Sequence, residues 1–248
     1  IENAKSVDFG DILSKSFELY KKDFNNGLMH ALVSLLVVIP FILVVYIPIL
    51  PFYVEMIQNA GDPYYSPSFL DEYGPGIIFG WVIFVLVLSF VMQVVIYSIY
   101  GHYYRSLKIA DVGGDEEIGG YFTLLQQNFG KLLLLTLATF GIALLATLLC
   151  YLPLLYVMVP LQLILPILAF NTELNVSDII KAAFKLGNKY WGILFGLIIV
   201  AGILSSLGMI ACYVGLIATA FFSHIVMYHF YKHSVGFEEV TEDITTNF

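Results

Sequence analysis

The sequence predicts an all-α polytopic membrane protein, with six transmembrane helices in three repeats of an amphipathic interfacial helix plus a transmembrane hairpin. Three observations lead to this prediction. Six apolar stretches of about 18–25 residues are long enough to cross a hydrocarbon core of roughly 30 Å as helices. Ten of the eleven Lys and Arg residues lie outside these stretches, and the other, Lys131, lies near the start of the third. A block of sequence also recurs three times along the chain, which indicates one structural unit used three times.

The six predicted spans are continuously apolar, unlike the alternating strands of a membrane barrel. They contain no Asp, Glu, Lys or Arg except Lys131, near the start of the third span. With 59% hydrophobic and 12% charged residues, the 248-residue chain has too little polar surface for an ordinary soluble domain. The spans are Leu28–Leu50, Ile77–Ile99, Phe129–Leu149, Leu152–Phe170, Ile193–Ala211 and Tyr213–Tyr231.

The basic residues lie in four segments, at 1–27, 101–131, 171–191 and 232–248. Two predicted spans lie between each segment and the next. This distribution predicts a multi-pass protein of the bacterial inner (cytoplasmic) membrane with both termini on the cytoplasmic side. The cytoplasmic segments carry 15 acidic side chains beside the 11 basic ones, and the exterior carries four acidic ones. Because this face is mixed rather than polybasic, we expect no nucleic-acid partner.

The repeat sets Asp11, Glu116 and Asp178 equivalent, and similar residues then follow at offsets of two, six, eight and thirteen. These residues are Leu13, Ile118 and Ile180; Phe17, Phe122 and Phe184; Leu19, Leu124 and Leu186; and Phe24, Phe129 and Trp191. The single membrane domain, 1–248, therefore divides into repeat 1 at about 8–107, repeat 2 at about 113–172, repeat 3 at about 175–235 and an acidic tail at 236–248. The repeats close around a pseudo-threefold axis or stack in a row; the sequence does not distinguish the two.

Each block has the spacing of a short amphipathic helix. In the first block Leu13, Phe17, Tyr20 and Phe24 share one face at 3.6 residues per turn. The acidic residue at offset zero suits a helix N-terminus, where backbone amides lack partners. We expect these helices to lie at the cytoplasmic membrane surface. The alternative is that each one is a cytoplasmic extension of the span that follows it.

The segment Pro160–Trp191 contains a Leu-Pro pair, an acidic turn and a helix around Ala182-Ala183-Phe184; the first copy has Lys15-Ser16-Phe17 at the matching place. This pattern resembles the bacterial integral membrane proteins related to YciC and to the membrane domain of glycerophosphodiester phosphodiesterases. Ala182 stands where that family tends to have Arg. The resemblance implies the six-helix architecture. It implies no catalytic residue, because the phosphodiesterase chemistry belongs to a separate soluble domain.

No Walker loop, nucleophile elbow or HExxH motif is present, so we expect no enzyme activity and no cofactor. His102, His229 and His233 match no tight metal-binding spacing, so we expect no metal site. The sequence favours a non-enzymatic accessory or scaffold subunit that binds other membrane proteins, membrane lipid or both. Its expected docking surfaces are the exterior loop at 51–76 and the cytoplasmic interfacial helices.

The alternative is a transporter or lipid-handling protein whose site lies between the repeats near the midplane. Intramembrane ionisable and polar groups mark such sites, and prolines break helices to expose backbone groups there. The same residues also suit plain helix packing and hydrogen bonding between helices. The candidates are His224, Gln93, Gln162, Pro40 and Pro160.

Cys150 and Cys212 lie at the exterior turns of equivalent hairpins. An oxidising exterior would permit a disulfide between them if the repeats bring them together. The alternative is two small apolar residues at helix ends.

Overall fold

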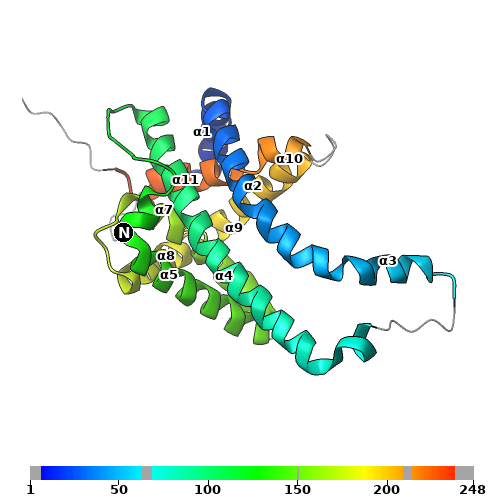
Figure 1. Ribbon diagram of the computed structural model, residues 1–248. Helices are drawn as coiled ribbons and strands as arrows, with labels where there is room; N and C mark the ends of the chain where they lie inside the picture. The colour runs from blue at the N-terminus through cyan, green and yellow to red at the C-terminus, as the bar shows by residue number, and fades with distance from the viewer. Residues whose placement is uncertain (1–6, 63–68, 150, 209–213, 238–248) are drawn as a thin grey trace, which may run out of the picture.

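The computed structural model describes residues 7–62, 69–149, 151–208 and 214–237, which form helices and no strand (Figure 1). The apolar helices are compatible with a membrane protein, as predicted. The elements are α1 (Phe9–Lys22), α2 (Phe24–Tyr46), the 3-10 turn η1 (Ile47–Ile49), α3 (Leu50–Gln58), α4 (Phe69–Val112), α5 (Thr123–Leu148), α6 (Leu152–Leu161), α7 (Ile164–Phe170), α8 (Val176–Lys189), α9 (Trp191–Ser206), α10 (Val214–Thr219) and α11 (Phe222–Ser234).

Among the described residues, four helical segments are long and apolar enough to cross a membrane. They are Phe24–Gln58, Gly74–Val112, Thr123–Leu148 and Leu152–Phe170. A fifth is present if α8 and α9, which meet at 92°, form one broken span. The predicted span Tyr213–Tyr231 is instead two helices, α10 and α11, separated at Ala220 and Phe221. The ring of Phe221 at this break stacks on Tyr20 of α1, 5.7 Å away.

The first and third sequence blocks fold alike. Helices α1 and α8 each have 14 residues, and the capping side chains of Asp8 and Asn175 accept hydrogen bonds from the backbone N–H groups of Asp11 and Asp178. This is the N-terminal role predicted for the segment around the two acidic residues. A single non-helical residue separates each of them from the next helix: Asp23 (φ −106°) after α1 and Tyr190 (φ −118°) after α8.

The prediction of an amphipathic helix in the second block is wrong, because residues 113–120 are not helical. Gly113, Gly114 and Gly119 have positive φ angles of 85°, 121° and 70°, which glycine adopts readily and which end a right-handed helix. Helix α5 starts only at Thr123 and is bent at Asn128 (φ −128°). Asn128 occupies the same offset in its block as Asp23 and Tyr190 do in theirs.

The buried face of α1 lies one residue before the predicted apolar face. Ile12, Ser16 and Leu19 are buried, whereas Phe17 is 41% exposed. The equivalent residues Ile179, Ala183 and Leu186 are buried in α8. The two helices therefore pack on the helical bundle, α1 against α11 and α8 against α6, with the predicted face at the edge of the contact.

In the predicted exterior loop at 51–76, most of the described residues are helical. Pro48 and Pro51 lie in the first turns of η1 and α3, where proline lacks only an N–H that would have no helical partner. Helix α4 begins at Phe69 and is broken at Gly74, whose φ is 64°. The prolines are therefore compatible with helix on one side of this segment, and Gly74 breaks the helix on the other.

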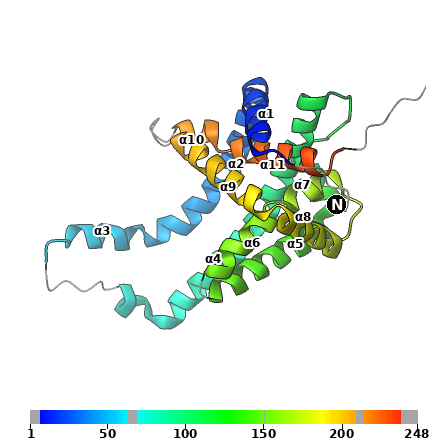
Figure 2. The same ribbon diagram turned by 180° about the vertical axis from the view of Figure 1, so that it is seen from behind.

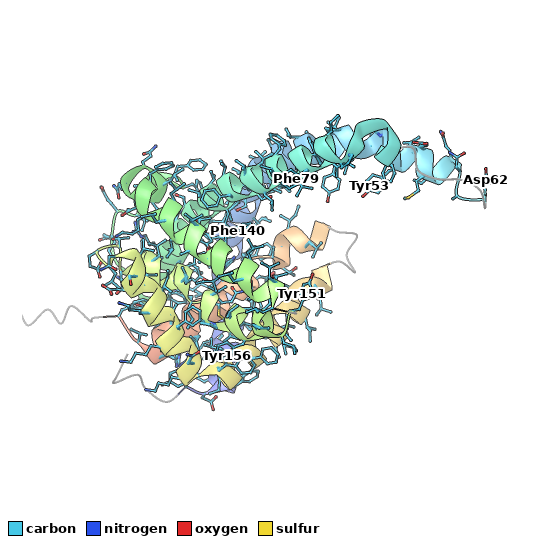
Figure 3. The ribbon with its side chains drawn as sticks, turned by 90° about the horizontal axis from the view of Figure 1, so that it is seen from below. Tyr53, Asp62, Phe79, Phe140, Tyr151 and Tyr156 are labelled. Atoms are coloured by element: carbon cyan, nitrogen blue, oxygen red, sulfur yellow. The ribbon has the colours of Figure 1, made fainter. Side chains whose placement is uncertain are left out.

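A projecting hairpin, residues 36–62 and 74–91, extends away from the bundle (Figures 1 and 2). Figure 3 shows Tyr53 and Phe79 along this extension and Asp62 at its far end. None of the described side chains in these two ranges is buried. The core lies at the opposite ends of α2 and α4, where large side chains from α4, the α6–α7 break, α7 and α11 are fully enclosed: Tyr103, Tyr104, Leu107, Leu163, Leu168, Tyr228 and Phe230.

Candidate functional site

A pocket with a polar lining, here called the α4–α5 pocket, lies between α4, α5 and the end of α6. Its volume is about 320 Å³, within the range typical of small-molecule sites. The polar lining residues are Ser89, Gln93, Tyr97, Thr136 and Thr139, and the apolar ones are Phe90, Phe140, Ala143 and Leu161. No side chain in this lining is a carboxylate, a base or a histidine, so the pocket suits an uncharged group.

The hydroxyl groups of the pocket are unequally satisfied. The Tyr97 hydroxyl lies 3.4 Å from Thr139 Oγ1, which donates to the carbonyl oxygen of Thr136 at 3.0 Å. Ser89 Oγ donates to the carbonyl oxygen of Val85 at 2.7 Å. Thr136 is only 1% exposed, and its own Oγ1 has no hydrogen-bond partner. An unpaired buried hydroxyl costs roughly 1–3 kcal/mol, so this one marks a place where a bound group would be stabilising.

The pocket lies deep along the apolar helices. Gln93 precedes Arg105, the first charged residue towards that end of α4, by 12 residues, or about 18 Å of helix. Tyr97 precedes Arg105 by eight residues, and Thr139 follows Lys131 of α5 by eight residues, about 12 Å in each case. The two helices therefore place the Tyr97–Thr139 contact at the same depth. With Arg105 and Lys131 at the edge of a hydrocarbon core of roughly 30 Å, the Tyr97–Thr139 contact would lie near its middle.

Of this pocket, the sequence alone identified only Gln93. A signal was present, because Ser89, Gln93 and Tyr97 follow one another at intervals of four and so share one face of α4. Serine and threonine in apolar helices are common, however, and usually bond within their own helix. The facing pair on α5 can be recognised only once the two helices are placed together.

A second polar cluster joins α2, α4 and the segment before α5. His30 Nε2 lies 2.7 Å from His102 Nδ1, while His30 Nδ1 lies 2.8 Å from the carbonyl oxygen of Asn26. His102 Nε2 lies 3.1 Å from the carbonyl oxygen of Gly119. Carbonyl oxygens only accept, so all three hydrogen bonds form together only when the two rings carry three N–H groups, one more than two neutral imidazoles provide.

Asp23 connects this cluster to the junction of α1 and α2. The side-chain amide of Asn26 donates to both carboxylate oxygens of Asp23, at 3.0 and 3.2 Å, and to Ser106 Oγ of α4 at 2.8 Å. Burial raises the pKa of Asp23 to about 6, against the opposite effects of the Asn26 hydrogen bonds and the nearby Lys22. A buried carboxyl group therefore titrates close to neutral pH beside the start of a span.

The structure does not gather the five predicted midplane residues into one site. His224 of α11 is beside Tyr100 and hydrogen-bonds through Nδ1 to the Tyr104 hydroxyl at 3.2 Å, rather than to Gln93 or Gln162. Gln93 lines the α4–α5 pocket, and Gln162 is exposed between α6 and α7. Pro160 is buried against α8, and Pro40 is exposed on α2.

The candidate prolines Pro40 and Pro160 lie within α2 and α6, and the break in the fourth predicted span lies before Pro166 instead. The span Leu152–Phe170 is interrupted at Gln162 and Leu163. Pro166 has no N–H to donate to the carbonyl oxygen of Gln162, and its ring would clash with that carbonyl in a regular helix. Pro160, in contrast, lies within α6, where its backbone is a packing surface: a Cβ at Gly187 of α8 would lie 2.7 Å from Pro160 Cα.

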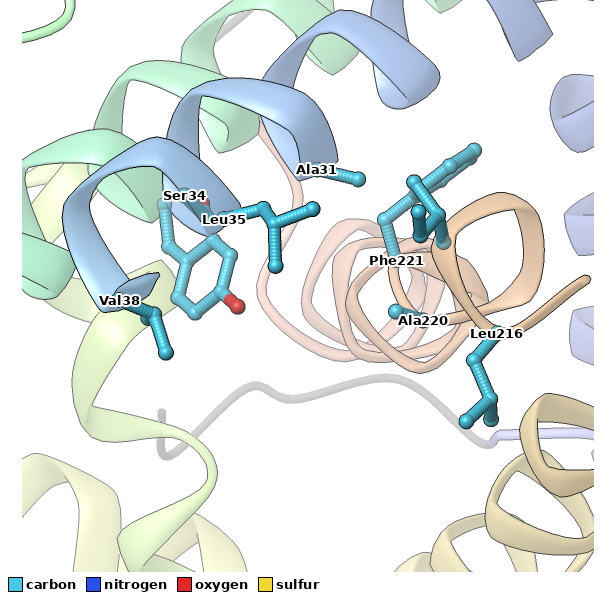
Figure 4. A pocket seen from close by; sticks show the side chains of 9 residues that line it. Ala31, Ser34, Leu35, Val38, Leu216, Ala220 and Phe221 are labelled. Carbon is cyan, nitrogen blue, oxygen red and sulfur yellow. The ribbon is translucent and has the colours of Figure 1, made fainter. Parts of the chain in front are cut away.

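A second pocket, of about 230 Å³, separates α2 from α10 (Figure 4). Its lining is mainly apolar, with Ala31, Leu35 and Val38 of α2 facing Leu216 and the α10–α11 turn at Ala220 and Phe221. Tyr100 and Ser34 provide the only hydroxyl groups among its lining residues. This pocket suits an apolar group, and it offers fewer polar contacts than the α4–α5 pocket.

The polar ends of the helices carry two ionic clusters. Asp111 Oδ2 accepts from the Tyr228 hydroxyl at 2.9 Å and from Lys232 Nζ at 2.6 Å. Asp11 Oδ2 pairs with Lys15 at 2.8 Å and lies 3.4 Å from His233 Nδ1. Burial and the nearby Lys15 lower the pKa of His233, against the opposite effect of Asp11. These contacts hold α1 and α4 to α11.

No three or more His, Cys, Asp and Glu side chains are grouped to hold a metal ion within the described ranges. His102, His229 and His233 do not converge: His102 is in the pair with His30, and the ring centroids of His229 and His233 are 6.4 Å apart. Cys150 and Cys212, the predicted disulfide candidates, lie outside the described residues.

Comparison of the chain with protein-family models, with curated proteins and with solved structures gives no match.

Proposed function

We propose that this protein is a non-enzymatic accessory or scaffold subunit of the bacterial inner membrane, with both termini cytoplasmic. In this proposal the chain crosses the membrane six times in three repeats, like the YciC-related proteins that its sequence resembles. The repeat is supported by the equal lengths and capping of α1 and α8. It is further supported by the backbone breaks at Asp23, Asn128 and Tyr190, which share one offset.

The observation that carries the proposal is the projecting hairpin. In the most apolar 18-residue window of Phe24–Gln58, only 6% of the residues are buried, and in that of Gly74–Val112 17% are. The corresponding share for Leu152–Phe170 is 50%. Large apolar side chains cover both arms of this hairpin, including Leu36, Ile57 and Phe79. An exposed apolar surface of this extent typically marks a contact with membrane or with another protein.

The form of the hairpin favours a protein partner over lipid alone. The arms diverge beyond their shared base, so neither arm packs along the other (Figures 1 and 2). Helix α3 has substantial contact only with the η1 turn that precedes it. Helix association in membranes gains its stability from close side-chain packing, and here both arms leave that packing unused within the chain. A partner's transmembrane helices would supply it.

Site-specific photo-crosslinking in the native membrane tests this function. A benzophenone amino acid replaces Phe79, which is 67% exposed on the projecting hairpin, or Leu145, which is 63% exposed on α5 of the bundle. We expect a discrete protein adduct from position 79 and only lipid adducts from position 145. Lipid adducts alone at both positions would contradict the docking role of the hairpin.

A further inference from the structure

We propose that the α4–α5 pocket binds a neutral amphiphile that presents a hydroxyl group and an ester carbonyl, the chemistry of a diacylglycerol. This inference goes beyond the docking role and does not depend on it. It begins from Thr136, a buried residue of the pocket lining whose Oγ1 has no hydrogen-bond partner. In an apolar surrounding no solvent replaces the missing partner, so a bound group that reaches it gains a full hydrogen bond.

The polar groups of the pocket fit both a donor and an acceptor on the ligand. The side-chain amide of Gln93 has two N–H donors and one acceptor oxygen. Its neighbour Tyr97, one turn away, has a single hydroxyl group and cannot satisfy all of them. Amide donors suit an ester carbonyl. The Thr136 and Thr139 hydroxyl oxygens accept as well as donate, so they suit a free hydroxyl group. All four side chains line the same pocket.

Depth and charge exclude an ionised headgroup. Tyr97 and Gln93 lie about 12–18 Å along α4 from the first charged side chain, well inside the hydrocarbon region. The lining offers no ion to pair with a phosphate, and an unpaired charge at this depth is costly. A neutral glyceride has no charge to bury. Its acyl chains would lie against Phe90, Phe140 and Leu161 and leave through the open side of the pocket.

Binding of 1,2-dioctanoylglycerol to the full chain in nonionic detergent, followed by native mass spectrometry, tests the proposal. Gln93→Leu is expected to weaken binding about tenfold, the loss expected for roughly one strong hydrogen bond. Thr136→Val keeps the shape of the side chain and removes the unpaired hydroxyl. We expect it to raise the unfolding temperature of the free protein and to weaken binding of the glyceride by about three- to tenfold.

The matched control is Thr147→Val. Thr147 lies on the same helix outside the pocket, and its hydroxyl is already satisfied by the carbonyl oxygen of Ala143 at 2.8 Å. It should neither stabilise the free protein nor change binding. Equal binding of the phosphatidic acid with the same acyl chains would overturn the proposal, as would glyceride binding that is insensitive to Gln93→Leu and Thr136→Val. A pocket that binds neither lipid would also overturn it, while leaving the result of the crosslinking at Phe79 unaffected.

Discussion

Replacement of Asp23 by Asn should stabilise the protein at neutral and alkaline pH. Burial raises the pKa of this carboxyl group from 3.8 to about 6, so the folded state holds a proton that the unfolded state releases. The stabilising effect of that proton is complete below pH 3.8, the ordinary pKa of the group, and is lost as the pH rises through about 6. Above pH 7 the folded protein therefore buries a carboxylate at a cost of about 3 kcal/mol, taking about 1.4 kcal/mol for each pKa unit.

Asparagine at this position keeps an oxygen that accepts from the side-chain amide of Asn26 and carries no charge. The assay is thermal unfolding in nonionic detergent between pH 5 and 8, with the wild-type protein measured beside Asp23→Asn. We expect the variant to gain up to about 3 kcal/mol at pH 8 and progressively less towards pH 5. Glu173→Gln, at an exposed carboxylate, serves as the control with no such trend. A difference between variant and wild type that does not change with pH would refute the reasoning.

Two packing predictions concern the bundle. Gly187→Ala places a methyl group 2.7 Å from the backbone of Pro160 and should cost about 1–3 kcal/mol in unfolding free energy, whereas Gly192→Ala, with open space around it, should not destabilise. Ser98→Ala should also cost about 1–3 kcal/mol, because buried Ser98 Oγ bonds both the carbonyl oxygen of Tyr121 and the N–H of Leu125. The exposed Ser206→Ala serves as its control. Thermal unfolding in detergent measures all four, and equal stability within either pair would contradict the packing described.

The fold class could be predicted because its signals are local. An apolar run without charge is visible in the sequence, and so are the acidic residues that begin α1 and α8. The second block was mispredicted because its glycine pairs outweigh the apolar spacing of Ile118 and Phe122. The prediction of a loop at 51–76 fails where Pro48 and Pro51 lie in first helical turns, because proline there is compatible with a helix.

Most of the α4–α5 pocket could not be predicted from the sequence, for a different reason. Gln93 stood out as a polar residue in an apolar stretch, but its partners Thr136 and Thr139 lie 43 and 46 residues further along the chain. Their alignment depends on how α4 and α5 are rotated against each other, which no single-helix pattern specifies. The contact of His30 with His102 depends in the same way on the packing of α2 against α4.

Native mass spectrometry of the protein extracted gently from its own membrane tests the proposed docking role most directly. The wild-type chain is compared with Ile77→Ala/Phe79→Ala on the projecting hairpin and with Leu144→Ala/Leu145→Ala on the bundle, at residues of similar exposure. We predict a stoichiometric protein partner that is lost from the hairpin variant and kept by the bundle variant. A wild-type chain that carries no protein partner, or a partner that the hairpin variant retains, would contradict the account.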